Sequence, residues 1–289
     1  MLQENKYQKS DELFDKELIK KRLDLAQNEP VDFISELVVE DLHQRLAAIK
    51  RDFQNAIIIG PNPKSFPPSS ASATSPINFS YISTLSNNGK TKAINANNLT
   101  LPNKNYDLII SFLDLQIIND VPKYLKQIHA HLNPDGLMIA AYIGNETLNE
   151  LRLSWLKADE EILGGSYARV APFIDIKSAG NLLQSAGFAL PVADIDHHIV
   201  RYSSALSLMK EIKTLCASNP LSQKPNEPIS KTHLFLAAKY YEENFADDDG
   251  RIRATLDILW MSGWKPHESQ QKPLARGSAQ VSMSQIFKK

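Results

Sequence analysis

The stretch Tyr106-Asp107-Leu108-Ile109-Ile110-Ser111-Phe112 decides the fold, because its short apolar run is typical of a strand buried on both faces. A helix is predicted after it at Val121–Leu132, with Asn119 or Asp120 as the N-cap. The turn Asn133-Pro134-Asp135-Gly136 then leads into a second apolar run, Leu137–Ile143. A strand, a helix and a strand in this order predict a parallel pair with a helix packed on the sheet.

Upstream, the apolar run Ala56–Ile59 ends in Gly60 and predicts another buried parallel strand, which we expect at the centre of the sheet. Ile77–Ile82 and Thr91–Asn95 are weaker strand candidates, and the proline- and serine-rich segment 62–76 is predicted as a loop. Further helices are predicted at Ser10–Asn28, Phe33–Phe53, Glu146–Leu163, Ile176–Ala186, Ser204–Cys216 and Lys231–Phe245, and further strands at Val192–Arg201 and Arg251–Met261. We therefore expect an α/β, Rossmann-like fold with a mostly parallel sheet flanked by helices. Residues 1–53 would form an N-terminal helical segment, and residues 54–289 the Rossmann-like domain, including a helical insertion and a polar C-terminal tail.

Composition excludes several classes of function. The 289 residues carry a net charge of −1, so no overall field attracts nucleic acid or an anionic membrane. A single cysteine, Cys216, permits neither a disulfide within the chain nor a multi-thiolate zinc site, and no other spacing marks a metal site. The longest apolar runs are far shorter than the ~20 residues that span a bilayer. The polar N-terminus lacks a secretory or transit pattern, so we expect a cytoplasmic protein without membrane insertion.

Several motifs resemble one known family. The strand Tyr106–Phe112 and the Asn-Pro-Asp-Gly turn are typical of class I S-adenosylmethionine (SAM) methyltransferases. More specific matches are Gly144-Asn145-Glu146-Thr147-Leu148, Arg169-Val170-Ala171-Pro172-Phe173, Ala186-Gly187-Phe188-Ala189-Leu190-Pro191, Arg201-Tyr202, Asp249-Gly250-Arg251-Ile252 and Pro266-His267-Glu268-Ser269-Gln270-Gln271-Lys272-Pro273-Leu274. These resemble the subfamily of mitochondrial complex I assembly factor 5 and its bacterial relatives, which is similar to the malonyl-carrier-protein methyltransferase of biotin synthesis. The resemblance implies SAM as cofactor and a protein or carrier-bound acceptor in respiratory complex I assembly.

The SAM site of this family has three requirements. A glycine-rich turn lets the backbone approach the ligand, and Gly60 meets this need, although Pro61 and Asn62 follow it. An acid after the second strand would hold the ribose, but Ser83 and Thr84 stand there. An amide at Asn97 can donate to and accept from an adenine edge. The cofactor-binding residues predicted here are Gly60, Asn62, Asn97 and Phe112. The alternatives are a plain strand-ending turn at Gly60 and a solvated loop residue at Asn97.

Two groups of residues are candidates for a substrate or partner surface. Arg169, Arg201, Arg251 and Arg253 could converge on an anionic group, or form scattered salt bridges. Glu268 and Gln271 lie in a polar segment between two prolines, which we expect to fold back beside Arg169 and Arg251; the alternative is a tail packed over a sheet edge.

No catalytic residue is identified by the sequence. The first hypothesis is methyl transfer, in which the protein mainly aligns the reacting atoms. The second is a methyltransferase-like binding module without catalysis, and a third is other chemistry on a protein side chain, such as arginine modification in the related assembly factors. An open pocket lined by Gly60, Asn97 and Phe112 would favour the enzyme, whereas a pocket filled by the segment 63–76 would favour the module.

Overall fold

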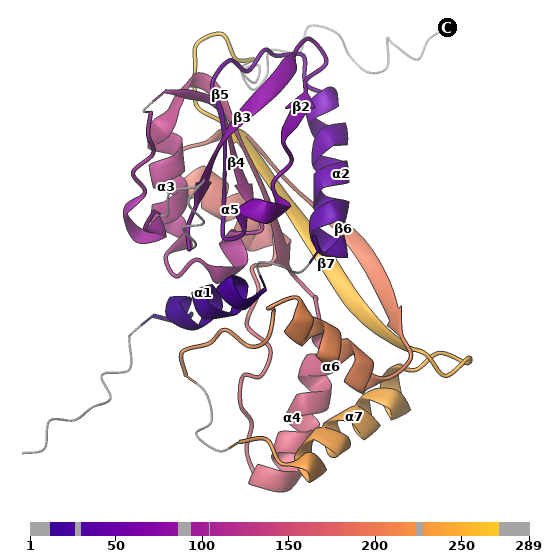
Figure 1. The fold of residues 1–289 in the computed structure, drawn as a ribbon. Coiled ribbons are helices and arrows are strands. Elements are labelled where there is room, and N and C mark those ends of the chain that lie inside the picture. The colour runs from indigo at the N-terminus through magenta and orange to yellow at the C-terminus, as the bar shows by residue number, and fades with distance from the viewer. Residues whose placement is uncertain (1–11, 27–29, 86–93, 104, 224–227, 272–289) are drawn as a thin grey trace, which may run out of the picture.

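A computed structural model describes residues 12–26, 30–85, 94–103, 105–223 and 228–271. The described strands form one sheet in the order β2-β3-β1-β4-β5-β7-β6 (Figure 1). Their bounds are β1 Ala56–Gly60, β2 Ser69–Ala71, β3 Pro76–Ser83, β4 Tyr106–Phe112, β5 Leu132–Gly144, β6 Ala189–Tyr202 and β7 Ile252–Trp264. Strands β3, β1, β4 and β5 run parallel, whereas β7 is antiparallel to β5 and β6, and β2 is antiparallel to β3. The expected α/β, Rossmann-like architecture is confirmed, with β1 inside the sheet between the parallel strands β3 and β4.

The helices are α1 Lys16–Leu25, α2 Phe33–Ala47, α3 Val121–His131, α4 Asn149–Leu163, α5 Ile176–Ser185, α6 Ala205–Thr214 and α7 Lys231–Phe245. Three short 3-10 turns are η1 Pro63–Ser65, η2 Ala96–Asn98 and η3 Leu115–Ile117. Side chains of Asp15, Asp32, Asp120, Asp175 and Ser230 accept a backbone hydrogen bond at the start of their helices, which satisfies amides that have no partner within the helix. None of the helices in the described ranges is long and apolar enough to cross a bilayer.

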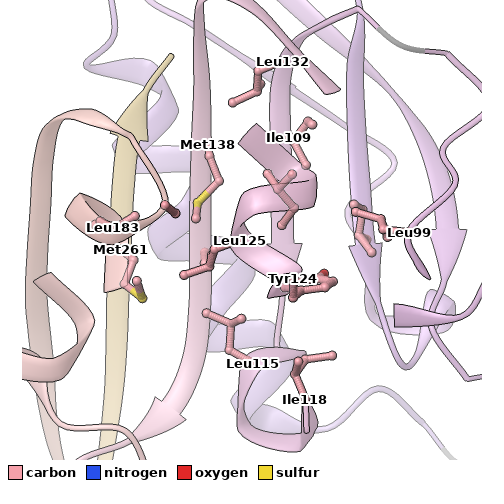
Figure 2. Packing of buried hydrophobic residues seen from close by; sticks show 14 of the residues in the cluster. Leu99, Ile109, Leu115, Ile118, Tyr124, Leu125, Leu132, Met138, Leu183 and Met261 are labelled. Carbon is pink, nitrogen blue, oxygen red and sulfur yellow. The ribbon is translucent and has the colours of Figure 1, made fainter. Parts of the chain in front are cut away.

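The two faces of the sheet are built by the alternation of side chains along each strand. On one face Ile57 and Ile59 pack with α3 and α5, and Figure 2 shows Leu125 and Leu183 of these helices beside Met138. On the other face Ile58 packs with α2, in a cluster that includes Val38, Leu42 and Leu46. The N-terminal helix α2 thus covers a face of the sheet, and the division of the chain at residue 53 stays a prediction.

Helices α4, α6 and α7 form a separate layer, the helical subdomain, below the carboxyl ends of the parallel strands (Figure 1). Its core contains Trp155 of α4, Leu208 of α6 and Tyr241 of α7. Helix α1 lies across the junction between this subdomain and the sheet. The carboxyl edge is where ligands bind in sheets of this kind, so the subdomain and α1 form its walls.

Several element boundaries differ from the sequence predictions. The cap of α1 is Asp15, whereas Ser10 lies outside the described residues. Helix α2 ends at Ala47, six residues before the predicted end at Phe53. The predicted loop 62–76 contains η1 and the edge strand β2, because Ser69–Ala71 pairs with β3. Of the candidate strand Thr91–Asn95, residues 91–93 lie outside the described ranges, and Asn95 caps η2.

Candidate functional site at the carboxyl edge of the sheet

A cavity of about 270 Å³ lies between the carboxyl edge of the sheet and the helical subdomain. Strands β1, β4 and β5 contribute Asn62, Phe112 and Ile143 at or just beyond their ends, and α1 contributes Ile19 and Leu23. Other lining residues include Gln116, Thr147, Leu148, Arg169, Phe173, Val200, Tyr202, Leu208, Ile212 and Cys216. The walls are mostly apolar with a few polar groups, which is the usual character of a site for a small organic group.

Of the predicted cofactor residues, Asn62 and Phe112 line this cavity, but Gly60 and Asn97 do not. Gly60 is pressed against its own chain: a Cβ atom there would lie 2.9 Å from the Phe66 ring and would also clash with the Phe112 carbonyl oxygen. The Phe66 ring stacks on Tyr81 and meets Phe112 edge-on, each with centroids 5.9 Å apart. Glycine is therefore required at position 60 for packing, and the proline-rich segment fills the space beside it.

The end of β3 carries a buried polar network in place of an acid for the ribose. Thr84 Oγ1 donates to Asp114 Oδ1 at 2.7 Å, and Tyr124 Oη donates to Asp114 Oδ2 at 2.8 Å. Asp114 is fully buried. Burial raises its pKa to about 6, and the two hydroxyl donors oppose that rise. The Thr84 hydroxyl thus donates its hydrogen bond to Asp114 inside the protein.

Asn97 is also engaged by the chain itself. Its Nδ2 donates to Glu12 Oε1 at 3.0 Å, and its Oδ1 accepts from Lys16 Nζ at 3.4 Å. Between these two residues, Phe14 is 5% exposed and packs in a cluster with Leu85, which follows β3. Residues 12–16 therefore lie against Asn97, the residue that the sequence predicts to contact adenine.

The described arrangement does not fit SAM. Pro61 has no N–H to donate at the turn after β1. The end of β3 offers Ser83 and Thr84 in place of a carboxylate, and both amide ends of Asn97 are taken.

The predicted arginines do not converge. Arg169 lines the cavity, but its guanidinium is held by Asp159, with a shortest N–O distance of 2.6 Å, and lies over the Trp155 ring. Arg201 pairs with Asp247 at 2.8 Å and with Asp249. Arg251 is exposed beside the start of β7. For Arg201 and Arg253, which both pair with Asp247, the salt-bridge alternative describes the structure.

The expected contact of the polar segment Pro266–Leu274 with Arg169 and Arg251 is not found in residues 266–271, which lie at the opposite edge of the sheet, and residues 272–274 lie outside the described residues. Lys265 exchanges backbone hydrogen bonds with Asp135 and Gly136, next to the start of the parallel pairing of β5. Glu268 and Gln271 are exposed in the turn that follows. Strand β7 runs antiparallel to β5, so its end is carried away from the cavity. A partner role for Glu268 and Gln271 stays a prediction.

Sequence reasoning missed three buried carboxylates. Asp114 follows β4 in an otherwise apolar run, and that position was the available signal. Asp159 lies on α4 and holds Arg169, and Asp257 lies 2.5 Å from His197 Nδ1 on β6. Cross-strand and cross-helix partners of this kind leave no local spacing in the sequence. Within the described residues, no group of three or more His, Cys, Asp or Glu side chains is arranged to hold a metal ion.

Comparison with known proteins identifies the family. A family model described as "Methyltransferase domain" matches residues 37–191. The mouse protein named "Arginine-hydroxylase NDUFAF5, mitochondrial" is 33% identical over 96% of this chain and 84% of its own length. Its zebrafish counterpart is 40% identical over 63% of this chain, and the match spans only 57% of that relative.

A malonyl-[acyl-carrier protein] O-methyltransferase of Halorhodospira halophila is 31% identical over 57% of this chain and 54% of its own. Among solved structures, the YcgJ protein of Bacillus subtilis covers 82% of this chain and all of its own, at 10% identity and a TM-score of 0.48. The family model and the mouse relative decide the assignment: the chain belongs to the class I SAM-dependent methyltransferase family.

Proposed function

We propose that this chain binds a protein-borne or carrier-borne acceptor during the assembly of respiratory complex I, and that the cavity receives the acceptor group. The observation that carries the proposal is the position of the cavity, at the carboxyl edge of the sheet and under the helical subdomain. The relatives support the acceptor class, since their names specify an arginine and a carrier-bound malonyl group. Neither nucleic acid nor membrane insertion is part of the proposal. A cytoplasmic location stays a prediction, and the animal relatives are named as mitochondrial.

Filling the cavity should abolish this function without unfolding the protein. Ile212 of α6 lines the cavity and is only partly buried, so Ile212→Trp would extend an indole into the space. We expect the level of assembled complex I, measured on native gels of a strain carrying only the variant, to fall at least about tenfold. A loss of this size corresponds to ~1.4 kcal/mol of binding, less than full burial of one large apolar side chain contributes.

The matched control is Leu206→Trp on the same helix, because Leu206 is 37% exposed and lies outside the cavity lining. It should leave assembly unchanged. Equal levels of complex I in the two strains, with both variants folded, would count against the cavity as the acceptor site.

A second candidate is an assembly module that no longer catalyses methyl transfer. The specific observation in its favour is that side chains of the chain itself occupy the expected SAM positions. Phe66 packs against Gly60, and Thr84 donates a hydrogen bond to Asp114. The module would still use the acceptor cavity, so cofactor binding is the measurement that separates the two candidates.

Calorimetric titration with SAM and with S-adenosylhomocysteine should show binding at least about tenfold weaker than in relatives that keep the ribose acid. The reason is that each charge-assisted hydrogen bond from a ribose hydroxyl contributes roughly 1.5–3 kcal/mol. A family member with the acid, titrated under the same conditions, is the control. Binding in the low nanomolar range would show that Ser83 and Thr84 do not stand at the ribose position.

A further inference from the structure

Unfavourable backbone conformation gathers in the wall of the cavity. The non-glycine residues with positive φ in the described ranges are Leu113, Asp135, Asn145, Leu148, Leu190 and Cys216. Aspartate and asparagine adopt this region readily, whereas leucine and cysteine do so at a cost. Three of the four costly positions line the cavity, and the fourth, Leu190, lies at an irregularity in the register of β6. Backbone strain of this kind persists where the side chain that it holds has a function.

Leu148 stands at its position against two local preferences. It is the N-cap of α4 with φ 55° and ψ 29°, and it offers no side-chain hydrogen bond to the helix. A serine, asparagine or aspartate would satisfy a free amide there. The Leu148 N–H donates to the Thr255 carbonyl oxygen at 2.9 Å, and the Thr255 hydroxyl donates to Glu150 at 2.6 Å. The surroundings thus fix a residue whose apolar side chain, in the cavity wall, is what a capping residue would lack.

Leu113 is fixed in the same way at the end of the neighbouring strand. It follows β4 directly and has φ 49°. Its N–H donates to the Ala141 carbonyl oxygen of β5 at 2.8 Å, and its own carbonyl oxygen accepts from Gln116 Nε2 at 2.8 Å. The segments after β4 and β5 therefore each place one held, partly buried leucine in the cavity wall.

The charged residues among the described lining already have partners in the chain. They are Asp32 and Arg169. Asp32 caps α2, where its carboxylate accepts from the Ser35 N–H and from the Ser35 hydroxyl, each at 2.8 Å. The Arg169 guanidinium is held by Asp159. A charged group that entered the cavity would leave water without a counter-ion set aside for it, which is costly. The wall is therefore suited to an uncharged group.

We propose that the cavity takes an uncharged aliphatic chain, and that Leu113 and Leu148 contact this chain and determine the specificity of the site. The inference rests on the proposed function, because it names the class of acceptor group that enters. Of the two acceptor classes, an acyl chain on a carrier has this chemistry, whereas an arginine side chain ends in a charge. The cost of the left-handed backbone is then offset by contacts that only a large apolar side chain makes.

The test is a calorimetric titration of the full chain with two probes, octanol and propylguanidinium. Octanol should bind with a negative change in heat capacity, because apolar surface is buried, and propylguanidinium should not bind. Leu148→Ala should weaken octanol binding at least about fivefold, and Leu148→Met, which keeps an apolar side chain of similar size, should restore it. Leu190→Ala is the matched control, since this left-handed leucine is 49% exposed and lies outside the cavity lining, and it should bind octanol as the unaltered chain does.

A failure of octanol to bind would overturn the proposal, and so would binding of propylguanidinium that Ile212→Trp removes. Equal losses of octanol affinity in Leu148→Ala and Leu190→Ala would overturn it as well. The probes are titrated against the purified chain, whereas the proposed function is judged by complex I assembly. Either can therefore fail while the other stands.

Urea unfolding tests the backbone argument separately. Leu148→Gly and Leu148→Ala both remove the side chain, but only glycine adopts a positive φ without cost. The midpoint of unfolding should therefore lie at a higher urea concentration for Leu148→Gly than for Leu148→Ala. A lower midpoint for the glycine variant would show that Leu148 is not held at a cost, and would overturn its assignment as a specificity residue.

Discussion

Replacing Asp159 with alanine is expected to lower the free energy of unfolding by about 3–5 kcal/mol, because it leaves a buried guanidinium without its carboxylate. Asp159 is fully buried, and the Arg169 side chain is 10% exposed. Arg169 Nε lies 2.8 Å from both carboxylate oxygens, and His233 Nε2 of α7 lies 2.8 Å from Oδ1. One carboxylate therefore joins α4, α7 and the loop that carries Arg169, and urea unfolding at neutral pH measures its contribution.

Glu160 is the natural control, since it is the next residue on α4 and forms only an exposed pair with Lys157 at 3.0 Å. Glu160→Ala should change stability by no more than about 0.5 kcal/mol. If Asp159→Ala cost no more than this control, the cluster would not hold the helical subdomain together. The position of Arg169 in the cavity wall would then need another explanation.

The fold was predictable from sequence because its signals are local. The apolar runs at β1, β4 and β5 and the capped start of α3 at Asp120 are each complete within about ten residues. The edge strand β2 was not predictable, because its three residues include two serines and it exists only through pairing with β3. An edge strand of this kind depends on tertiary context more than on its own propensity.

The site was only partly predictable, because its decisive contacts join distant parts of the chain. Phe112 ends β4 and Asn62 stands two residues after the end of β1, so both positions could be predicted from the strands, and both line the cavity. Asn97 follows from the fold too, but its engagement by Glu12 and Lys16 spans more than 80 residues. No spacing in the sequence encodes such a contact. The predicted position of the segment that follows β7 is wrong for a related reason. The antiparallel direction of β7 decides which edge of the sheet the described residues 266–271 reach.

Asp114→Asn is expected to stabilise the protein at neutral pH by up to ~3 kcal/mol. Below about pH 4 the substitution should have no such effect. Burial raises the pKa of Asp114 from 3.8 to about 6 in the folded state. Each unit of pKa difference between the folded and unfolded states is worth about 1.4 kcal/mol. An amide at this position can still accept from Thr84 Oγ1, and it can donate to the Tyr124 hydroxyl, which lies 3.4 Å from Ser111 Oγ.

The sign of the pH dependence follows from the raised pKa. Below about pH 4 the carboxyl is protonated in both states, and its stabilising contribution is fully present. Between about pH 4 and 6 the unfolded chain ionises first, so stability is lost as the pH rises through this window. Above about pH 6 both states are ionised and the loss is complete. The amide introduced by Asp114→Asn has no proton to lose, so the stability difference between the variant and the unaltered protein should grow from about pH 4 to 6 and then stay constant.

Urea unfolding at half-unit steps from pH 4 to 8 measures this difference directly. Glu40→Gln removes a carboxylate on the exposed side of α2 and should give a profile parallel to that of the unaltered protein. A stability difference that does not change with pH would show that Asp114 titrates alike in the folded and unfolded states. If that constant difference were a loss, it would also show that the amide does not replace the hydrogen bonds that Asp114 accepts from Thr84 and Tyr124. A difference that grows only between pH 4 and 6 would establish that ionisation of the buried Asp114 carboxyl lowers the stability of the folded protein.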